Sequence, residues 1–177
     1  MPSELTHAVE DYLKAIYELA ETYERVSTTQ LAERLNITPA SVTGMIQRMA
    51  AADPPLVEYQ KHRGVLLTQP GQAVALEIIR HHRLLELFLQ RTLGYAWDEV
   101  HEEADRLEHV ISEDLEERIA HLLGNPTHDP HGEPIPTRDL RLPPTAATCL
   151  CDLRSGQVAT ISRVDAADLV LLRYLSE

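Results

Sequence analysis

The sequence predicts a mainly α-helical fold that consists of an N-terminal winged helix-turn-helix, a helical domain and a short partial β segment. Two observations lead to this fold class. Apolar residues recur at helical spacing over most of the 177 residues. The stretch 28–68 instead has the order helix, tight turn, helix and basic hairpin. We therefore expect three parts, residues 1–71, 72–140 and 141–177.

The first helix is expected over residues 5–22. Thr6 is a suitable N-cap residue, because its hydroxyl can accept a hydrogen bond from a backbone N–H of the first turn. Asp11 lies off the apolar stripe of this helix. The stripe itself has helical spacing and consists of Val9, Leu13, Ile16 and Ala20.

A helix-turn-helix is expected next, with a short helix over 28–35, a turn at 36–38 and a second helix from Pro39 to about Ala51. Thr38 is the expected cap of the second helix. Pro39 then occupies the first helical position, where a missing N–H costs nothing. The buried face of the pair is expected to consist of Leu31, Leu35, Val42, Ile46 and Met49.

Two short strands, 56–60 and 64–68, follow the break at Asp53-Pro54-Pro55, and basic residues join them. This order is that of a winged helix-turn-helix. Any small α+β domain can contain two helices and a hairpin. Here the outer side of the second helix carries small polar residues that can approach a groove closely, which favours DNA binding. The residues predicted to contact DNA are Thr28, Pro39, Ala40, Ser41, Thr43, Gln47, Arg48, Lys61 and Arg63, the last three on phosphates.

Long helices return from residue 72, first to Gly94, a suitable residue just beyond a helix end, and then as one or two helices that close at Gly124. Their apolar faces exceed what one antiparallel pair would bury, so we expect a homodimer. A proline-rich connector follows over 125–145. The remaining residues predict a strand, a turn at Ser155-Gly156, a second strand and a short helix.

The formal charge of −12 argues against simple nucleic-acid binding, which needs cations facing phosphates. The distribution of charge answers this objection. Residues 27–68 carry four basic and three acidic side chains, whereas residues 76–125 carry five arginines, twelve acidic residues and five of the nine histidines. One segment can therefore approach DNA. The other concentrates carboxylate and imidazole, which hard and borderline cations prefer.

The sequence predicts a cytoplasmic protein. No apolar run approaches the roughly 18 residues that a membrane helix needs. The N-terminus has no basic region followed by an apolar stretch, so we expect no secretory signal and no membrane partner. Two cysteines, Cys149 and Cys151, support neither a disulfide framework nor a four-cysteine zinc site.

Histidine and acidic residues at helical spacing predict a metal site. At about 100° per residue, His101, Asp105, Glu108 and His109 fall within one helical sector. His82 and Glu86 are four residues apart on the preceding helix and share a face. The alternative is that these are solvated helix faces with weak surface ion pairs. The other histidines of this region show no such pairing, and we expect His81, His121, His128 and His131 to be structural, solvated or turn-forming.

These segments together resemble the diphtheria-toxin-repressor family of iron- and manganese-dependent regulators. The resemblance rests on EDYLKAIYEL, LAERLNITPASVTGMIQRM, RHHRLLELFL, HEEADRLEHVIS and PHGEPIP, in this order. It implies a winged domain, a helical dimerisation domain and, at residues 141–177, a linker with a truncated SH3-like segment. It also implies a primary metal site at Asp11, Asp105, Glu108 and His109, and an ancillary site at His82, Glu86 and His101.

Departures from the family pattern bear on the metal. The iron-type branch has methionine and cysteine where this chain has Asp11 and Asp105, and carboxylates shift the expected preference toward Mn²⁺. Fe²⁺ is the alternative, and Zn²⁺, Co²⁺, Ni²⁺ or Cd²⁺ are possible substitutes. Lys14 stands where the short manganese-type branch has a second carboxylate, so two separated sites are expected. Gly44 replaces a longer side chain, so base contacts do not transfer.

The expected function is metal-activated transcriptional regulation, by repression of metal-uptake genes, and not enzyme catalysis. A cation bound by Asp11 and by the acidic helix is expected to fix two recognition helices near the roughly 34 Å repeat of the major groove. Two alternatives remain open. One is a metal-independent helix-turn-helix regulator, and the other is a helical metallohydrolase, for which the sequence shows no HExxH motif or nucleophile elbow.

Overall fold

The computed structural model describes residues 5–144, 148–164 and 168–176. The chain forms two compact units that divide between Ile79 and Arg80, inside helix α4. They are the N-terminal unit, residues 1–79, and the C-terminal unit, residues 80–177.

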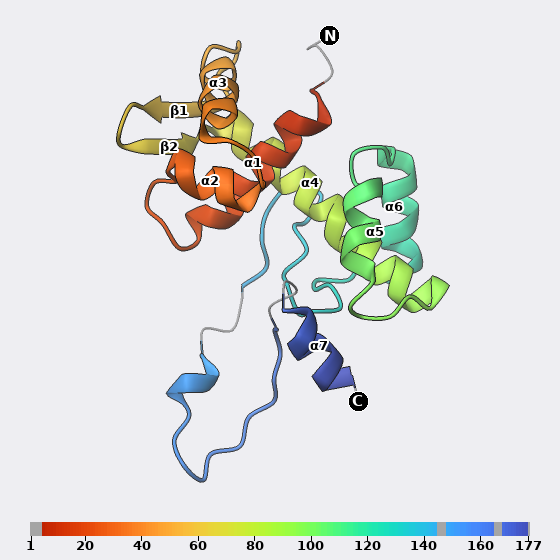
Figure 1. The fold of residues 1–177 in the computed structure, drawn as a ribbon. Coiled ribbons are helices and arrows are strands. Elements are labelled where there is room, and N and C mark those ends of the chain that lie inside the picture. Colours follow the sequence, from red (N-terminus) through yellow and green to blue (C-terminus); the bar gives the residue numbers. More distant parts are fainter. Residues whose placement is uncertain (1–4, 145–147, 165–167, 177) are drawn as a thin grey trace. The chain divides into compact units, whose positions relative to one another are not determined.

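The N-terminal unit is a helix-turn-helix followed by a hairpin (Figure 1). Its elements are α1 (His7–Ala20), α2 (Thr28–Arg34), α3 (Pro39–Ala50), β1 (Val57–Gln60), β2 (Gly64–Leu67) and the first half of α4 (Gln69–Phe88). These bounds agree with the expected ones to within a few residues. The sequence therefore predicted this unit correctly, element by element.

Side-chain caps explain where α2 and α3 begin. Ser27 accepts from the backbone N–H of Gln30, and the Gln30 side chain accepts from the N–H of Ser27, which together form a capping box. Thr38 caps α3 as predicted, because its hydroxyl accepts from the Ser41 N–H and Pro39 occupies the first turn. Thr6 is the N-cap residue of α1, but its side chain makes no capping bond.

The hairpin pairs β1 and β2 antiparallel, with Val57 opposite Leu67 and Gln60 opposite Gly64. An isolated antiparallel bridge between Val26 and Val65 joins the chain before α2 to β2. Gly64 has a φ of 99°, and a Cβ there would lie 2.6 Å from the Val26 carbonyl oxygen. Position 64 therefore requires glycine for both its backbone conformation and its close contact.

One apolar core closes the N-terminal unit. α1, α2, α3 and the hairpin all contribute to it, and the predicted inner face of the helix pair is buried there, with Leu35 partly exposed. The residues that are fully inaccessible in this core are Leu13, Ile16, Val26, Leu31, Val42, Ile46, Val65 and Ala75.

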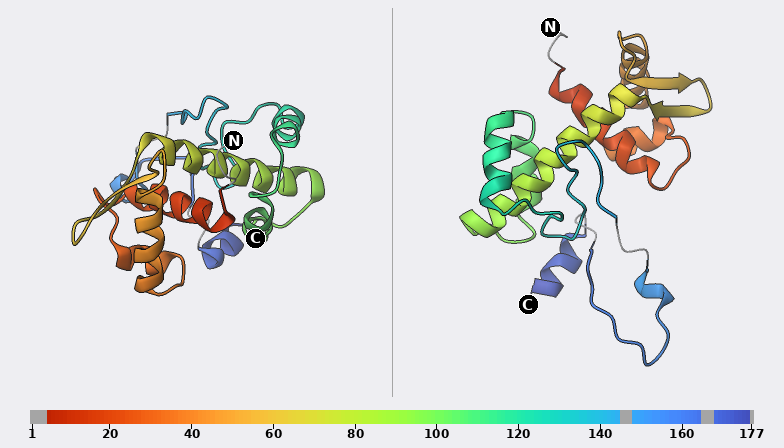
Figure 2. Two further views of the ribbon diagram at one scale, coloured as in Figure 1. Left: turned by 90° about the horizontal axis from the view of Figure 1, so that it is seen from above. Right: turned by 180° about the vertical axis from the view of Figure 1, so that it is seen from behind.

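The C-terminal unit contains the second half of α4, α5 (Val100–Leu107) and α6 (Glu113–Leu122), which lie beside one another in all the views (Figures 1 and 2). A π-helical turn, Leu89–Leu93, ends α4 at Gly94, whose φ of 74° is left-handed, as expected for this position. Residues of all three helices and Ile135 of the connector form one core.

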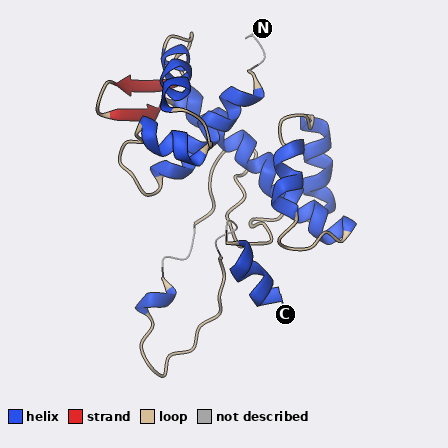
Figure 3. Cartoon of the chain, viewed as in Figure 1, coloured by secondary structure: helices blue, strands red, loops and turns tan. Residues whose placement is uncertain are grey.

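The C-terminal segment differs from the expected strand, turn and strand. Its described residues contain a 3₁₀ turn at Leu150–Asp152 and helix α7 (Leu169–Ser176), but no strand (Figure 3). The turn at 155–156 and the final helix agree with the prediction, and the two strands were wrong for the described residues. A single isolated hairpin has too few partners to be stable in water. Among the described helices, none is both long and apolar enough to cross a membrane.

Candidate metal centre and DNA-binding face

Six of the seven predicted metal ligands lie in the C-terminal unit. His82 and Glu86 are on α4, and His101 and Asp105 are on α5. Glu108 and His109 lie in the turn that follows α5, because this helix ends at Leu107. The helical spacing predicted one helix for His101, Asp105, Glu108 and His109. This was wrong for Glu108 and His109, which lie just beyond the end of α5.

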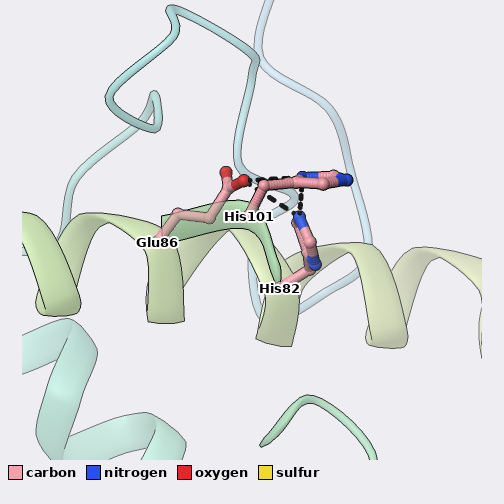
Figure 4. Close-up of side chains that lie close together, drawn as sticks. All are labelled: His82, Glu86 and His101. Atoms are coloured by element: carbon pink, nitrogen blue, oxygen red, sulfur yellow. Dashed lines mark hydrogen bonds and ion pairs between the residues drawn. The ribbon is translucent and has the colours of Figure 1, made fainter. Parts of the chain in front are cut away.

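His82, Glu86 and His101 form a compact group of donor atoms (Figure 4). Glu86 Oε1 lies 3.0 Å from both His82 Nε2 and His101 Nδ1. These two nitrogens are themselves 3.0 Å apart. Only 5% of His82 and 1% of Glu86 is exposed, whereas His101 is half-buried. Three donors thus converge at one point on the inner face of α4.

The other nitrogen of His82 faces two further carboxylates. His82 Nδ1 lies 2.5 Å from Glu108 Oε2 and 3.2 Å from Asp105 Oδ1. Glu108 is buried, and its Oε1 lies 3.6 Å from His109 Nε2. His82 therefore connects the two predicted sets of ligands through its two ring nitrogens.

His131 is a buried member of the cluster that sequence reasoning missed. Its Nδ1 lies 3.6 Å from Glu86 Oε2 and 3.8 Å from Asp129 Oδ2. The imidazole is fully buried, and within the described part of the chain this nitrogen has no hydrogen-bond partner. The expectation of a solvated or turn-forming residue is confirmed for exposed His128, whereas His131 forms part of a turn but is buried and not solvated. A buried nitrogen within ion-pair distance of two carboxylates indicates a place for positive charge, carried by the imidazolium or by a bound cation.

A tight turn places Asp129 and His131. Asp129 Oδ1 accepts from the backbone N–H groups of His131 and Glu133, each at 2.8 Å. Gly132 has a φ of 85°, and its Cα lies so close to the C-terminal segment that a Cβ would be 1.8 Å from the Ser162 carbonyl oxygen. The N–H of Val164 donates to the His131 carbonyl. The C-terminal segment thus covers this turn, which explains the burial of His131.

The charged groups of the cluster shift the pKa values of Glu86 and His131 in opposite directions. Burial opposes ionisation of Glu86, but its contacts with His101, His131 and His82 outweigh this effect and hold the pKa of Glu86 well below its usual value. Burial also lowers the pKa of His131, yet Asp129 and Glu86 together raise it to about 10. In the ion-free protein, His131 is therefore an internal cation between two carboxylates.

The donor set suits a hard or borderline divalent cation. It offers carboxylate oxygen and imidazole nitrogen and, among these residues, no thiol. A separate group of Cys149, Cys151 and Asp152 is fully exposed, with both cysteines free. Asp11 is the seventh predicted ligand and lies on α1 of the N-terminal unit, so the predicted ligands are divided between the two units.

The residues predicted to contact DNA gather on the helix pair and the hairpin tip of the N-terminal unit. They lie at the start of α2, on α3 and beside the β1–β2 turn. All are exposed except Thr28 and Thr43, which are half-buried. The Thr43 hydroxyl donates to the Pro39 carbonyl at 2.9 Å, so its hydrogen bond is already used within α3. Gly44 has open space around its Cα.

Comparison with known proteins matches two domains of one family. Residues 4–65 match the N-terminal DNA-binding domain of iron-dependent repressors. Residues 68–137 match the metal-binding and dimerisation domain of the same proteins. The iron-dependent repressor IdeR of Mycobacterium leprae is 38% identical over 169 residues, which cover 91% of this chain and 73% of IdeR. The chain belongs to the iron-dependent repressor family.

Relatives within this family differ in length and in metal. IdeR of Mycobacterium tuberculosis is 40% identical over 134 residues, and the match spans 76% of this chain but only 57% of that relative. A manganese-dependent transcriptional repressor in complex with manganese has a TM-score of 0.85 at 43% identity, over 95% of this chain and 77% of the other. The repressor fold and the family are thus established for the chain.

Proposed function

We propose that this protein is a manganese-activated transcriptional repressor in the cytoplasm. It would bind operator DNA as a homodimer and repress genes for metal uptake. The observation that carries the proposal is the buried histidine–carboxylate cluster around Glu86, in a chain whose other unit is a winged helix-turn-helix. Fe²⁺ is the alternative activator, and Zn²⁺, Co²⁺, Ni²⁺ or Cd²⁺ are substitutes.

The residues proposed to hold the ancillary ion are His82, Glu86 and His101. His131 lies against the second oxygen of Glu86, and Asp129 lies beside His131. Asp105, Glu108 and His109 are proposed for the primary ion, together with Asp11 of α1. A bound divalent cation supplies positive charge that offsets the repulsion among these carboxylates.

Ligand hardness favours manganese. Position 105 and position 11 are aspartates, and the ligand cluster of the C-terminal unit consists of oxygen and nitrogen donors. Such ligands suit Mn²⁺ better than a thiolate-containing set would. The solved manganese-dependent repressor that this chain resembles supports the same choice.

Asp11 gives the proposal its regulatory part. It lies on the first helix of the winged unit, whereas its proposed co-ligands lie in the other unit. If these residues share an ion, the ion joins the winged helix-turn-helix to the dimerisation domain, and the two are joined only when the metal is present. The differential affinity of the metal for the joined form then sets the change in operator binding.

The exposed face of the C-terminal unit supports a dimer. Leu115 and Leu122 are seven residues apart on α6, and they are 46% and 65% exposed. Val110, in the turn before α6, is 63% exposed. An apolar stripe of this kind favours contact with a second copy of the chain.

Metal-dependent DNA binding tests the proposal. The manganese-loaded protein is used to select duplexes from a random pool, and the selected DNA is then titrated with and without a chelator. We expect Mn²⁺ to increase affinity at least tenfold. Glu86→Gln should lose this increase, and Glu102→Gln should keep it, because Glu102 is exposed on α5 and pairs only at the surface with Arg106. Equal DNA affinity with Mn²⁺ and with chelator would overturn the proposal.

A further inference from the structure

We propose that Trp97 is a positioning residue of the metal centre, which holds His131 with its Nδ1 directed toward Glu86 and Asp129. This inference rests on the proposed function, since the orientation of His131 matters only if the cluster binds an ion. It assigns a role to the single tryptophan of the chain, which lies between α4 and α5 and supplies no predicted ligand.

Two contacts fix the His131 ring. The indole of Trp97 stacks on the imidazole, with the ring centroids 5.7 Å apart and an angle of 7° between the planes. The His131 Nε2–H donates to the Trp97 backbone carbonyl at 3.2 Å. The stack defines the plane of the imidazole and the hydrogen bond defines its rotation, so Nδ1 faces the two carboxylates.

The hydrogen bond has the form expected behind a metal ligand. A histidine that binds a metal through one nitrogen commonly donates its other N–H to a carbonyl or carboxylate, which fixes the tautomer and the ring orientation. Here the carbonyl of Trp97 accepts from Nε2 and leaves Nδ1 for the cluster. Nδ1 is also the nitrogen that has no hydrogen-bond partner within the described residues.

The loop that carries Trp97 is held on its other side. Asp98, the next residue, pairs with Arg173 of α7 at 2.6 Å, and Glu99 accepts from the Ala96 N–H at 3.2 Å. The Trp97 Nε1 is buried and unpaired in the described part of the chain. An unpaired buried N–H costs about 1–3 kcal/mol, so a hydrogen bond does not orient the indole. Its specific contact is the stack on His131.

A comparison of two substitutions separates positioning from simple filling of space. Trp97→Leu fills much of the volume with an apolar side chain but has no aromatic face, whereas Trp97→Phe keeps an aromatic face. We expect Trp97→Leu to lower the Mn²⁺ association constant about 10- to 100-fold, the range for residues that support a metal ligand. Trp97→Phe should restore most of the affinity. Tyr95→Leu, two residues away and exposed, is the matched control and should bind as the unmodified protein does.

A double-mutant cycle supplies the decisive readout, with calorimetric titration of Mn²⁺ into the full ion-free chain. In a His131→Asn background, Trp97→Leu should cause no further loss of affinity, because the residue that it positions is gone. Fully additive losses, or equal affinities of Trp97→Leu and Trp97→Phe, would overturn the inference. If His131→Asn alone leaves Mn²⁺ binding unchanged, the proposed ligand role of His131 fails first, and the positioning role fails with it.

Discussion

Metal binding at the His131 side of the cluster should release a proton. The carboxylates of Asp129 and Glu86 raise the pKa of His131 to about 10, so about one molecule in a thousand has a neutral ring at pH 7. A nitrogen ligand must be deprotonated before it binds a metal. Removal of this proton at pH 7 costs about 4 kcal/mol, at 1.36 kcal/mol per pH unit over three units. The contribution of His131 to the apparent Mn²⁺ association constant should therefore rise about tenfold for each pH unit between pH 6.5 and 8.

Calorimetry in two buffers of different protonation enthalpy measures the released protons directly. At pH 7.5, the unmodified protein should release about one proton more per cluster than His131→Asn, which has no titrating ring at this position. His128→Asn is the control, because this histidine is exposed in the same connector and has no contact with the ligand cluster among the described residues. Its proton release should equal that of the unmodified protein.

The same ion pair affects the stability of the ion-free protein. Because folding raises the pKa of His131, its contribution is fully present below pH 6.5 and is lost as pH rises through about 10. The ion-free protein should therefore lose more stability between pH 7 and 10 than His131→Asn does, as measured by urea unfolding. Equal proton release by both proteins, together with parallel stability profiles, would refute the reasoning.

Two predictions concern the scaffold. Gly132→Ala should weaken Mn²⁺ binding and lower stability in thermal unfolding, because its Cβ would meet the Ser162 carbonyl; Gly124→Ala, with a similar φ of 78° but open space, should show only the smaller backbone penalty. Ile46→Ala should destabilise the N-terminal unit by about 2–5 kcal/mol in chemical denaturation, since Ile46 is fully buried. The matched Ile37→Ala, at an exposed position, should change stability by about 0.5 kcal/mol or less. Equal effects within either pair would contradict the structural explanation.

Local signals made the N-terminal unit predictable. Thr38 and Pro39 fix the start of α3, and the apolar spacing of Leu31, Val42 and Ile46 fixes which faces meet. The pair His82 and Glu86 was predictable for the same reason, because residues four apart on a helix share a face. In each case the chemistry and the geometry reside within one short stretch of sequence.

The parts that the sequence did not predict depend on distant contacts. His131 and Asp129 lie in a proline-rich connector without periodicity, and they are buried because residues 162–164 cover them. A buried Asx-type turn, with Asp129 accepting from two later N–H groups, was the one local signal, and it is common in exposed turns as well. The end of α5 at Leu107 was also not predicted, because Glu108 and His109 beyond it continue the helical spacing of the sequence.

The closed apolar core of the N-terminal unit has a consequence for the speed of the response. None of the predicted ligands belongs to this core, so we expect the winged helix-turn-helix to stay folded when no metal is bound. Under the proposed function, the protein would bind DNA again without a refolding step when the ion returns. Its response time would then be set by ion exchange and diffusion, and the folded, metal-free molecules would be spared the degradation that unfolded chains undergo.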